Sequence, residues 1–396
     1  MHSPNLGDGV IADCLVHILR QVDEKTDISL VDFSGRINNS TETCAAKTKL
    51  NCFQIVHRFL GQSKFYRKMM ALLVWNCKKR KRLSSYWRQK FANSNIVVIG
   101  GGQLLMDNEL SFILRVREIV KTAHSLNKKV VFYACGVGDK WSRLGSHLLA
   151  KALLDDNVSW ISIRDCGSRE TLQSLLPSCK LKLNIAMDPA LFAADTYGIN
   201  ASTESNIIGL GILSPSTLRR RTKGANNKFS TKNVRQFWIN LAKLLTADHQ
   251  PFAFFTNGRS DDYAFAESII AELCSSDINQ QIVLLEQPDN PRHLVEQIAQ
   301  FKAIVAHRLH ANMIAYSLCI PSIGLVWDTK VAEFGKMTKR ENFYLDTDQM
   351  DPNIVQQKLY EAISTGIDKF CVADQQSSSI KNLHNMLGSL EIVPSV

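Results

Sequence analysis

Residues 96–102 read Ile-Val-Val-Ile-Gly-Gly-Gly, and this short stretch decides the fold class. Four β-branched residues followed by glycine are typical of a buried strand, and a later stretch, Glu109 to Ser125, has helical periodicity. The same alternation of a short apolar run and a helical pattern recurs along the chain. Strands that alternate with helices in this way form a parallel sheet with helical crossovers. We therefore predict an α/β protein.

Outward from this stretch, the alternation predicts two halves of similar size. Strands of the first half are expected at Ile96–Ile99, Val130–Tyr133, Trp160–Ile163 and Leu183–Ala186. After a polar link, strands of the second half are expected at Ile207–Leu210, Phe252–Phe255, Ile282–Leu285, Ala303–Val305 and Ser322–Val326. We expect two doubly wound Rossmann-like domains facing a cleft, with residues 1–200 in the first, 201–345 in the second and a helical tail at 346–396. Ligands of such sheets bind beyond the carboxyl ends of the strands.

The N-terminus departs from this pattern. Asn5-Leu6-Gly7-Asp8 has the character of a loop that enters a helix at Gly9–Gln21, and such a loop normally follows the first strand. Only four residues precede it. We expect this strand either to be missing or to lie upstream of Met1, and we favour the second interpretation.

Composition excludes several protein classes. Apolar residues make up 45% and charged residues 21% of the chain, which is ordinary for a globular protein. The longest apolar run, Met69–Trp75, is far shorter than the roughly 18 residues of a membrane span. The first residues contain neither a basic region nor a long apolar region, so we expect no secretory signal. The ten cysteines include no Cys-x-x-Cys pair, which argues against a zinc knuckle or a disulfide framework. These features predict a cytoplasmic protein.

Positive charge is concentrated in one segment. The net charge is +10, and residues 47–92 contain thirteen Lys or Arg and no Asp or Glu. We interpret residues 47–92 as a basic helical insertion, in which an apolar strip of Phe65, Met69, Leu72 and Trp75 is typical of a helix lying on an anionic membrane surface. A solvated helix over the domain core is the alternative. Nucleic acid is the weakest interpretation, because no recognition motif accompanies the charge, and we predict no nucleic-acid partner.

Three groups of residues follow predicted strands or open a predicted helix. Gly100-Gly101-Gly102 lets the backbone approach a phosphate or carboxylate, although it matches neither a Walker loop nor a dinucleotide fingerprint and could serve only to pack a helix. Arg164 closes a strand and could bind a carboxylate or phosphate, or form a surface salt bridge with Asp165. Asn5 and Asp8 could belong to a site or only cap a helix.

The densest group is His307-Arg308-Leu309-His310-Ala311, which follows a strand and opens a helix. Two imidazoles three residues apart could share a helical face and bind a metal, but no Cys, Asp or Glu lies at ligand spacing, so we predict no metal site. A titratable His beside an Arg suits proton transfer next to an anion better. A histidine satisfied by a backbone carbonyl is the remaining alternative. Lys330, after the next strand, adds another cation.

Taken together, these motifs resemble those of the polysaccharide pyruvyl transferase family. The resemblance covers most of the chain and includes Asn5-Leu6-Gly7-Asp8, Gly100-Gly101-Gly102, Arg164-Asp165-x-x-Ser168, Asp188-Pro189-Ala190, Arg308-Leu309-His310-Ala311 and Asp328-Thr329-Lys330-Val331. It implies a glycosyltransferase-B-like fold and transfer of pyruvate from phosphoenolpyruvate to two sugar hydroxyls, forming a ketal. It also implies roles for Asp8, Arg164, His310 and Lys330. One departure is Gly9, where the family usually has an acidic residue.

The resemblance and the residues together give a working assignment. His310 is expected to be the general acid or base, and Asp8 a base or orienter for an acceptor hydroxyl. The donor would be bound by Arg164, Arg308, Lys330 and the three glycines Gly100, Gly101 and Gly102. Acceptor contacts are assigned to Asn5, Asp188 and Arg219. The resemblance further implies no cofactor beyond phosphoenolpyruvate as co-substrate, a lipid-linked oligosaccharide acceptor, and a place in bacterial exopolysaccharide or capsule synthesis at the inner face of the cytoplasmic membrane.

Two other functions are compatible with the same sequence. A glycosyltransferase of this architecture would use a nucleotide sugar, and Asp261-Asp262 could then contact the ribose. A catalytically silent assembly factor would be held at the membrane by residues 47–92.

Overall fold

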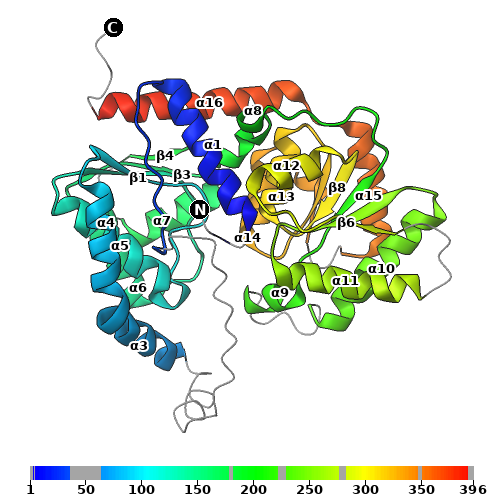
Figure 1. The fold of residues 1–396 in the computed structure, drawn as a ribbon, viewed down its shortest axis with the longest axis horizontal. Coiled ribbons are helices and arrows are strands. Elements are labelled where there is room, and N and C mark those ends of the chain that lie inside the picture. The colour runs from blue at the N-terminus through cyan, green and yellow to red at the C-terminus, as the bar shows by residue number, and fades with distance from the viewer. Residues whose placement is uncertain are drawn as a thin grey trace. The chain divides into compact units, whose positions relative to one another are not determined.

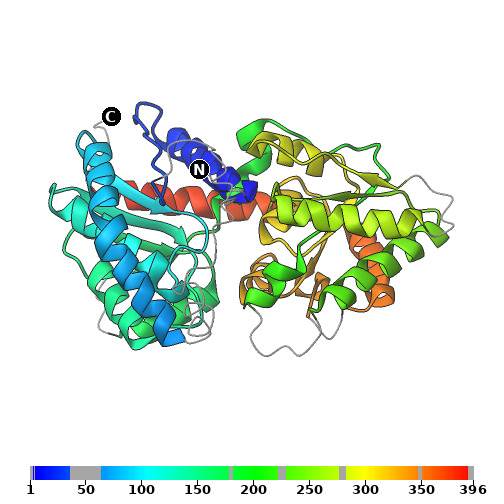
Figure 2. The same cartoon turned by 60° about the horizontal axis from the view of Figure 1, so that its bottom comes forward.

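The computed structural model describes residues 3, 5–35, 64–177, 182–221, 229–275, 282–346 and 350–390. Contacts divide the chain into two compact units. The first unit comprises Met1–His2, Thr26–Ala186 and Asn382–Val396, and the second comprises Ser3–Lys25 and Met187–Lys381. Both contain an all-parallel sheet with helical crossovers (Figures 1 and 2). The predicted fold class, two Rossmann-like α/β units, is confirmed.

The first unit has a four-stranded sheet in the order β1-β2-β3-β4. Its strands are β1 (Ile96–Gly100), β2 (Lys129–Cys135), β3 (Val158–Ile163) and β4 (Leu183–Ile185). Its helices are α3 (Lys64–Val74), the π-helical turn η1 (Trp75–Lys79), α4 (Arg80–Phe91), η2 (Asn108–Leu110), α5 (Ser111–His124), α6 (Arg143–Leu153) and α7 (Cys166–Leu175). Helices α4 and α5 pack side by side (Figure 1). The strands follow the expected positions to within two residues at each end.

The second unit has a six-stranded sheet in the order β10-β9-β8-β5-β6-β7. Its strands are β5 (Ile208–Gly211), β6 (Phe252–Phe255), β7 (Val283–Leu284), β8 (Ala303–Ala306), β9 (Ser322–Leu325) and β10 (Tyr344–Leu345). Its helices are α1 (Leu6–Val22), η3 (Pro189–Phe192), α8 (Ala193–Tyr197), α9 (Pro215–Arg221), α10 (Thr231–Ala247), α11 (Ser260–Cys274), α12 (Pro291–Ala299), α13 (Leu309–Ser317), α14 (Thr329–Met337), η4 (Glu341–Phe343), α15 (Pro352–Thr365) and α16 (Lys369–Ser389), whose last residues belong to the first unit.

The strand order of the second unit reverses between β5 and β8. Strands β5, β6 and β7 run outward in one direction, and β8, β9 and β10 run outward in the other. Helices α12 and α13 consequently lie on one side of the strands and α10 and α11 on the other (Figure 1). The loops after β5 and β8 therefore diverge at a topological switch point, where open α/β sheets bind their ligands.

The structure divides the chain differently from the expected boundaries at residues 200 and 345. Helix α1 belongs to the second unit, because the apolar side chains of Val10, Cys14 and Ile18 are fully buried where α1 packs on η3, α8 and α12. The tail as far as Lys381 also joins this unit, in which α15 packs on α10 and β9. Of the predicted basic insertion, residues 47–63 lie outside the described part of the chain.

Candidate functional site

The first turns of α1 and α13 bring three candidate side chains together in the second unit. Asn5 Nδ2 lies 3.1 Å from Asp8 Oδ1 and 3.3 Å from His310 Nδ1, and Asp8 Oδ1 lies 3.7 Å from the same imidazole nitrogen. Gly7 makes this approach possible, because a Cβ at Gly7 would stand 2.3 Å from His310 Nδ1. Gly7, between Asn5 and Asp8, thus allows the N-terminus of α1 to lie against the N-terminus of α13.

Asn5 is not a conventional helix cap. It precedes α1, but its side chain makes no capping hydrogen bond to that helix. Its amide faces Asp8 and His310 instead, and its Oδ1 atom is buried with no hydrogen-bond partner among the described residues. An unsatisfied buried acceptor has a cost, which a ligand hydroxyl could offset by donating to it. The geometry therefore favours a site over a cap at this position.

Packing also explains why residue 9 is a glycine. A Cβ there would lie 2.7 Å from Cγ of Pro291, the first residue of α12. An acidic side chain at this position would collide with α12. The absence of the usual family residue thus follows from how α1 packs.

Arg308 lies at the switch point of the sheet and is bound to a buried carboxylate. Its guanidinium forms an ion pair with Asp262, in which Nε lies 3.1 Å from Oδ2. The other carboxylate oxygen of Asp262 accepts a hydrogen bond from the Ser214 backbone N–H at 2.8 Å, in the loop after β5. Burial raises the pKa of Asp262, whereas Arg308 and the Ser214 N–H oppose this rise. The ion pair ties the loops after β5 and β8 to α11.

The same region contains Asp261 and Asp262, the two carboxylates that a nucleotide sugar was expected to contact through its ribose. Asp262 is fully buried and satisfied by Arg308 and Ser214, and Asp261 forms a bidentate ion pair with Arg259, with distances of 2.8 and 2.9 Å. Asp262 is thus enclosed by its partners, whereas the Asp261 side chain is 34% exposed.

His307 and His310 occupy different environments. His307 ends the turn after β8 and is buried, whereas α13 begins at Leu309, so the two imidazoles do not share a helical face. Burial, reinforced by the charge of Arg308, lowers the pKa of His307 to about 3. His307 is therefore neutral near pH 7. Among the described residues, no group of three or more His, Cys, Asp or Glu side chains is arranged to hold a metal ion.

Trp327 links the end of β8 to Lys330. Its indole N–H donates to the His307 carbonyl at 2.7 Å, and Lys330 Nζ lies 5.3 Å from the centre of its ring. Lys330 Nζ also lies 3.7 Å from Asp328 Oδ2, at the start of α14. Since β8 and β9 are neighbours, Lys330 belongs to the same edge of the sheet as Arg308 and His310.

Two polar residues at this edge did not enter the predicted site. Thr256 Oγ1 and Asn257 Nδ2 follow β6, and both are buried without a hydrogen-bond partner among the described residues. The Asn257 carbonyl accepts the Leu6 N–H at 3.0 Å, which places it beside the first turn of α1. In the sequence, these two residues were marked only by Thr256-Asn257-Gly258 directly after a predicted strand.

The remaining acceptor candidates have local roles. Asp188 is buried and caps η3 by accepting the Ala190 N–H at 3.2 Å. Its carboxylate therefore serves the backbone of η3. Arg219 is exposed on α9, and its Nη1 donates to Thr231 Oγ1 at 3.1 Å.

The first unit carries the other candidate residues at the carboxyl ends of its strands. Gly101 and Gly102 both have φ of +68°, a conformation that only glycine adopts readily. Their backbone joins the loop after β2: Gly101 N–H donates to the Tyr133 carbonyl at 2.9 Å, and Gly136 N–H donates to the Gly102 carbonyl at 2.8 Å. The predicted need for glycine after β1 thus has a conformational basis.

Arg164 lies against this glycine loop and is almost fully buried. A Cβ at Gly136 would stand 2.7 Å from Arg164 Nε, so the guanidinium passes directly over that backbone. Arg164 Nε pairs with Asp165 Oδ2 at 3.2 Å, while Asp165 Oδ1 caps α7 by accepting the Ser168 N–H at 2.7 Å. The ion pair with Asp165 exists, but it is buried and oriented, unlike a surface salt bridge.

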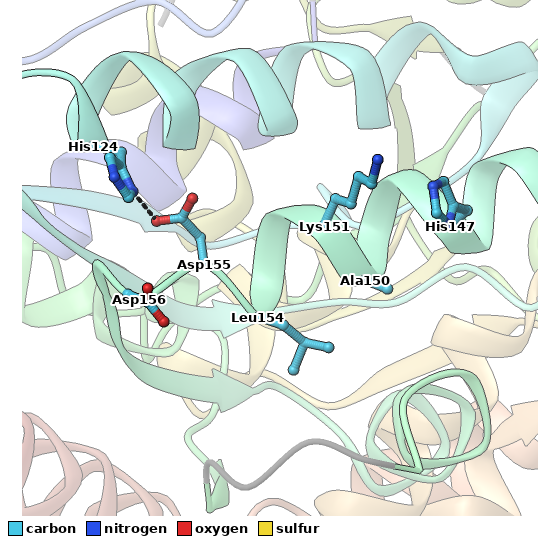
Figure 3. Close-up of a pocket in the computed structure, with 7 residues that line it drawn as sticks. All are labelled: His124, His147, Ala150, Lys151, Leu154, Asp155 and Asp156. Atoms are coloured by element: carbon cyan, nitrogen blue, oxygen red, sulfur yellow. Dashed lines mark hydrogen bonds and ion pairs between the residues drawn. The ribbon is translucent and has the colours of Figure 1, made fainter.

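The first unit also has a hollow of about 430 Å³ at the opposite edge of its sheet. Figure 3 shows its lining: His124, His147, Ala150, Lys151, Leu154, Asp155 and Asp156. His124 Nδ1 lies 2.8 Å from Asp155 Oδ1, and this carboxylate raises the pKa of the imidazole. The residues belong to the end of α5 and to α6 and the loop after it, near the amino ends of strands. None of the predicted site residues lines it.

Comparison with known proteins gives one family match. A family model described as polysaccharide pyruvyl transferase matches residues 5–329. No curated protein matches the chain.

Solved structures show remote similarity. The chain resembles the Staphylococcus aureus MnaA–UDP complex, with 11% identity, 80% of each chain covered and a TM-score of 0.47. It also resembles a UDP-GlcNAc 2-epimerase from Methanocaldococcus jannaschii, with 13% identity, 72% and 74% of the two chains covered and a TM-score of 0.47.

Proposed function

Because this chain belongs to the polysaccharide pyruvyl transferase family, we propose that it transfers pyruvate from phosphoenolpyruvate onto two hydroxyls of a sugar acceptor. The product is a cyclic ketal, and inorganic phosphate is released. The observation that carries this proposal is the cluster of Asn5, Asp8 and His310, in which a titratable imidazole lies beside a carboxylate and an unsatisfied amide oxygen.

The chemistry makes two demands on the protein. An acid must protonate C3 of phosphoenolpyruvate, which turns the methylene into a methyl group and leaves cationic character at C2. One sugar hydroxyl then attacks C2 and loses its proton, and the second hydroxyl replaces the phosphate at the same carbon. The protein must also stabilise a carboxylate and a phosphate, which requires fixed cations and backbone amides.

Each demand has candidate residues. We assign the protonation of C3 to His310 and the orientation or deprotonation of an acceptor hydroxyl to Asp8, with Asn5 Oδ1 accepting a hydrogen bond from the acceptor. Lys330 and Arg164 are assigned to the anionic donor, and the glycine loop at 100–102 to close backbone approach. Arg308 is assigned to the donor as well, and its ion pair with buried Asp262 would hold the loop that presents His310.

The proposal also includes the class of acceptor and the place of the reaction in the cell. The family points to a saccharide acceptor, and we propose a lipid-linked oligosaccharide used in bacterial exopolysaccharide or capsule synthesis. The reaction would take place in the cytoplasm, at the inner face of the membrane, with no cofactor beyond the co-substrate. Among the described residues, no helix is long and apolar enough to cross a membrane.

The experiment that tests this function is phosphoenolpyruvate binding, measured by thermal shift and calorimetry. We expect the donor at 100 times its Kd to stabilise the wild type by about 2.7 kcal/mol. Arg164→Gln should abolish this shift. The matched control is Arg340→Gln, because Arg340 is also buried but lies after α14, outside the predicted site.

The outcomes separate the interpretations. Stabilisation that survives in Arg340→Gln and disappears in Arg164→Gln supports the donor assignment, and phosphate release with lipid-linked acceptors then tests turnover. A wild type that responds to UDP-sugars and not to phosphoenolpyruvate would overturn the proposal.

A further inference from the structure

The helix formed by α3, η1 and α4 has two chemically different faces. Its inner face packs into the core of the first unit through Trp75, Leu83, Trp87 and Phe91, all of which are buried. The π turn η1 makes this possible. It accommodates one extra residue, equivalent to about 100° of α-helical rotation, so that Trp87 and Phe91 point the same way as Trp75. The opposite face remains exposed.

The apolar strip expected on this segment is therefore different from the one observed. Leu72 packs against the core and Trp75 is buried, so neither is available to a membrane. The side chain of Phe65 lies outside the described part of the structure. Met69 and Leu73, one helical turn apart on α3, are 40% and 50% exposed. In Figure 1, α3 lies at the lower left, below α6 and away from the strands of the first sheet.

The basic residues divide into two sets. One set contacts the body of the unit: Arg67 pairs with Glu109, Lys68 with Asp107 and Arg80 with Glu118, at 2.9–3.1 Å. The other set is exposed and, within the described residues, forms no ion pair: Lys78, Lys79, Lys81 and Arg82. Four cations within five residues, with no acid among them, concentrate positive potential on the exposed side.

We propose that this outer face, defined as Met69, Leu73, Lys78, Lys79, Lys81 and Arg82, docks the protein on an anionic lipid bilayer. The cations attract the headgroups, and Met69 and Leu73 enter the interface beside them, as in helices that lie in the membrane plane. The inner face anchors the helix to the unit, so docking needs no unfolding. This surface does not depend on the proposed reaction.

Charge complementarity alone would also suit nucleic acid. The exposed Met69 and Leu73 favour lipid, because insertion of aliphatic side chains gains free energy in a bilayer but not along a phosphate backbone. An exposed aromatic side chain would be expected on a surface that stacks nucleic-acid bases. Trp75 and Trp87 are buried and Tyr66 and Tyr86 are half-buried, so none of the aromatic side chains described on this helix is exposed.

Cosedimentation of the full chain with vesicles tests the proposal. Vesicles of phosphatidylethanolamine and phosphatidylglycerol in a 3:1 ratio should bind the wild type, and phosphatidylcholine vesicles should not. Four cations account for up to about a thousandfold in partitioning, so K78Q/K79Q/K81Q/R82Q should bind at least tenfold more weakly. The control K232Q/K243Q/K302Q/K339Q removes the same charge from exposed positions of the second unit and should bind like the wild type.

A second variant tests the apolar contribution. Met69→Gln combined with Leu73→Gln should weaken binding to the anionic vesicles, and the remaining binding should fall steeply with salt. All of these positions are exposed, and unchanged thermal unfolding would confirm that the variants fold.

Three results would overturn the proposal: no binding of wild type to anionic vesicles, equal losses in the two fourfold variants, or tighter binding to an oligonucleotide than to vesicles in the same buffer. Phosphoenolpyruvate binding by the outer-face variants separates this test from that of the proposed reaction.

Discussion

His307 and His310 are three residues apart, but their surroundings give them opposite properties. His307 is enclosed beside Trp238, whose ring lies 5.6 Å away, and burial keeps its imidazole neutral near pH 7. His310 is partly exposed and faces Asp8 and Asn5. A proton donor near neutral pH needs an imidazole that can be protonated there. Burial excludes His307 from this role and leaves His310 as the candidate, a choice that sequence spacing alone could not make.

Replacing His310 with Ala should lower turnover by at least about a hundredfold, because a lost general acid costs this much or more. The measurement is phosphate release with saturating phosphoenolpyruvate and acceptor. His147→Ala is the control, since His147 is exposed in the hollow of the first unit, away from the predicted site. Turnover of the His310 variant close to that of His147→Ala would contradict the assignment.

The buried imidazole of His307 should make stability depend on pH. Its pKa is about 3 in the folded protein, against about 6.5 in an unfolded chain. Between these values the unfolded state binds the additional proton, so the free energy of unfolding falls as the pH falls from 6.5 toward 3. The slope for one proton is about 1.4 kcal/mol per pH unit.

Urea unfolding at several pH values measures this slope. His307→Gln should lose stability less steeply than wild type as the pH falls, by a difference approaching one proton. His147→Gln, which removes an exposed imidazole, should keep the wild-type slope. Parallel curves for wild type and His307→Gln would show that the imidazole is protonated in the folded protein.

Sequence reasoning at the residue scale identified motifs, and the structure shows which of their residues lie close together, whereas the roles stay predictions. Asn5, Asp8 and His310 do come together, whereas Asp188 turns out to cap a 3-10 helix. Thr256 and Asn257 were overlooked as site residues because polar residues after a strand are common. Their unsatisfied buried atoms exist only in three dimensions.

At the scale of elements, Gly7 sets how closely α1 approaches α13. Gly7→Ala would put a Cβ 2.3 Å from His310 Nδ1 and 2.4 Å from His310 Cβ. Either α1 shifts or His310 turns away. We expect a loss of about 1–3 kcal/mol in the free energy of unfolding, together with a large fall in turnover. Chemical denaturation and the phosphate-release assay measure the two effects.

Gly388 provides the matched control. It also lies inside a helix, α16, but a Cβ there would meet no atom within 4 Å. Gly388→Ala should therefore be neutral or stabilise the protein by up to about 1 kcal/mol, since alanine favours a helix. If the two variants had equal stability and activity, the close contact between α1 and His310 would not exist in solution.

The helix that carries the basic residues shows why periodicity misplaces a face. Periodicity grouped Leu72 and Trp75 on one face but could not tell whether that face meets the core or a membrane, and in the structure it meets the core. After this strip, an unbroken α-helix would keep the same angular step per residue. The π turn at Trp75–Lys79 shifts the phase and brings Trp87 and Phe91 onto the core side. No residue type marks a π turn. By contrast, the strands were predicted to within two residues, because buried β-branched runs are distinctive. Within the described part of the chain, the two-residue strand β10 is the one that was missed.

At the scale of the whole molecule, the order of the elements along the chain differs from the order in which they pack. Parallel strands with helical crossovers could be predicted, because each strand and each helix is indicated by its own local sequence pattern. The reversal between β5 and β8 sets Ser214 beside Arg308, nearly a hundred residues further along, and local patterns do not encode it. For the same reason the sequence assigned α1 to the first half, where its neighbours in the chain lie, although its apolar face is buried in the second unit.

The assignment of α1 to the second unit leads to a prediction about local stability. Ile18 is fully buried on α1, a helix that packs against η3, α8 and α12, so Ile18→Ala should destabilise by about 2–5 kcal/mol. The loss should reach the elements that share this core. Hydrogen exchange is the measurement, because it resolves stability along the chain. Backbone amides of β5, β6 and β8 should lose protection, while those of β1, β2 and β3 keep it.

Leu149→Ala is the mirror experiment, because Leu149 is fully buried on α6 in the first unit. It should cost a similar free energy and lower protection in β1, β2 and β3 first. The contrast between the two variants matters more than either magnitude, since each alone could reflect global unfolding. If Ile18→Ala instead exposed β1 and β2 while β5 and β8 stayed protected, α1 would belong to the first unit in solution. Asn5 and Asp8 would then no longer be held against His310 by the core of the second unit, and the proposed acid–base cluster would lose its structural basis.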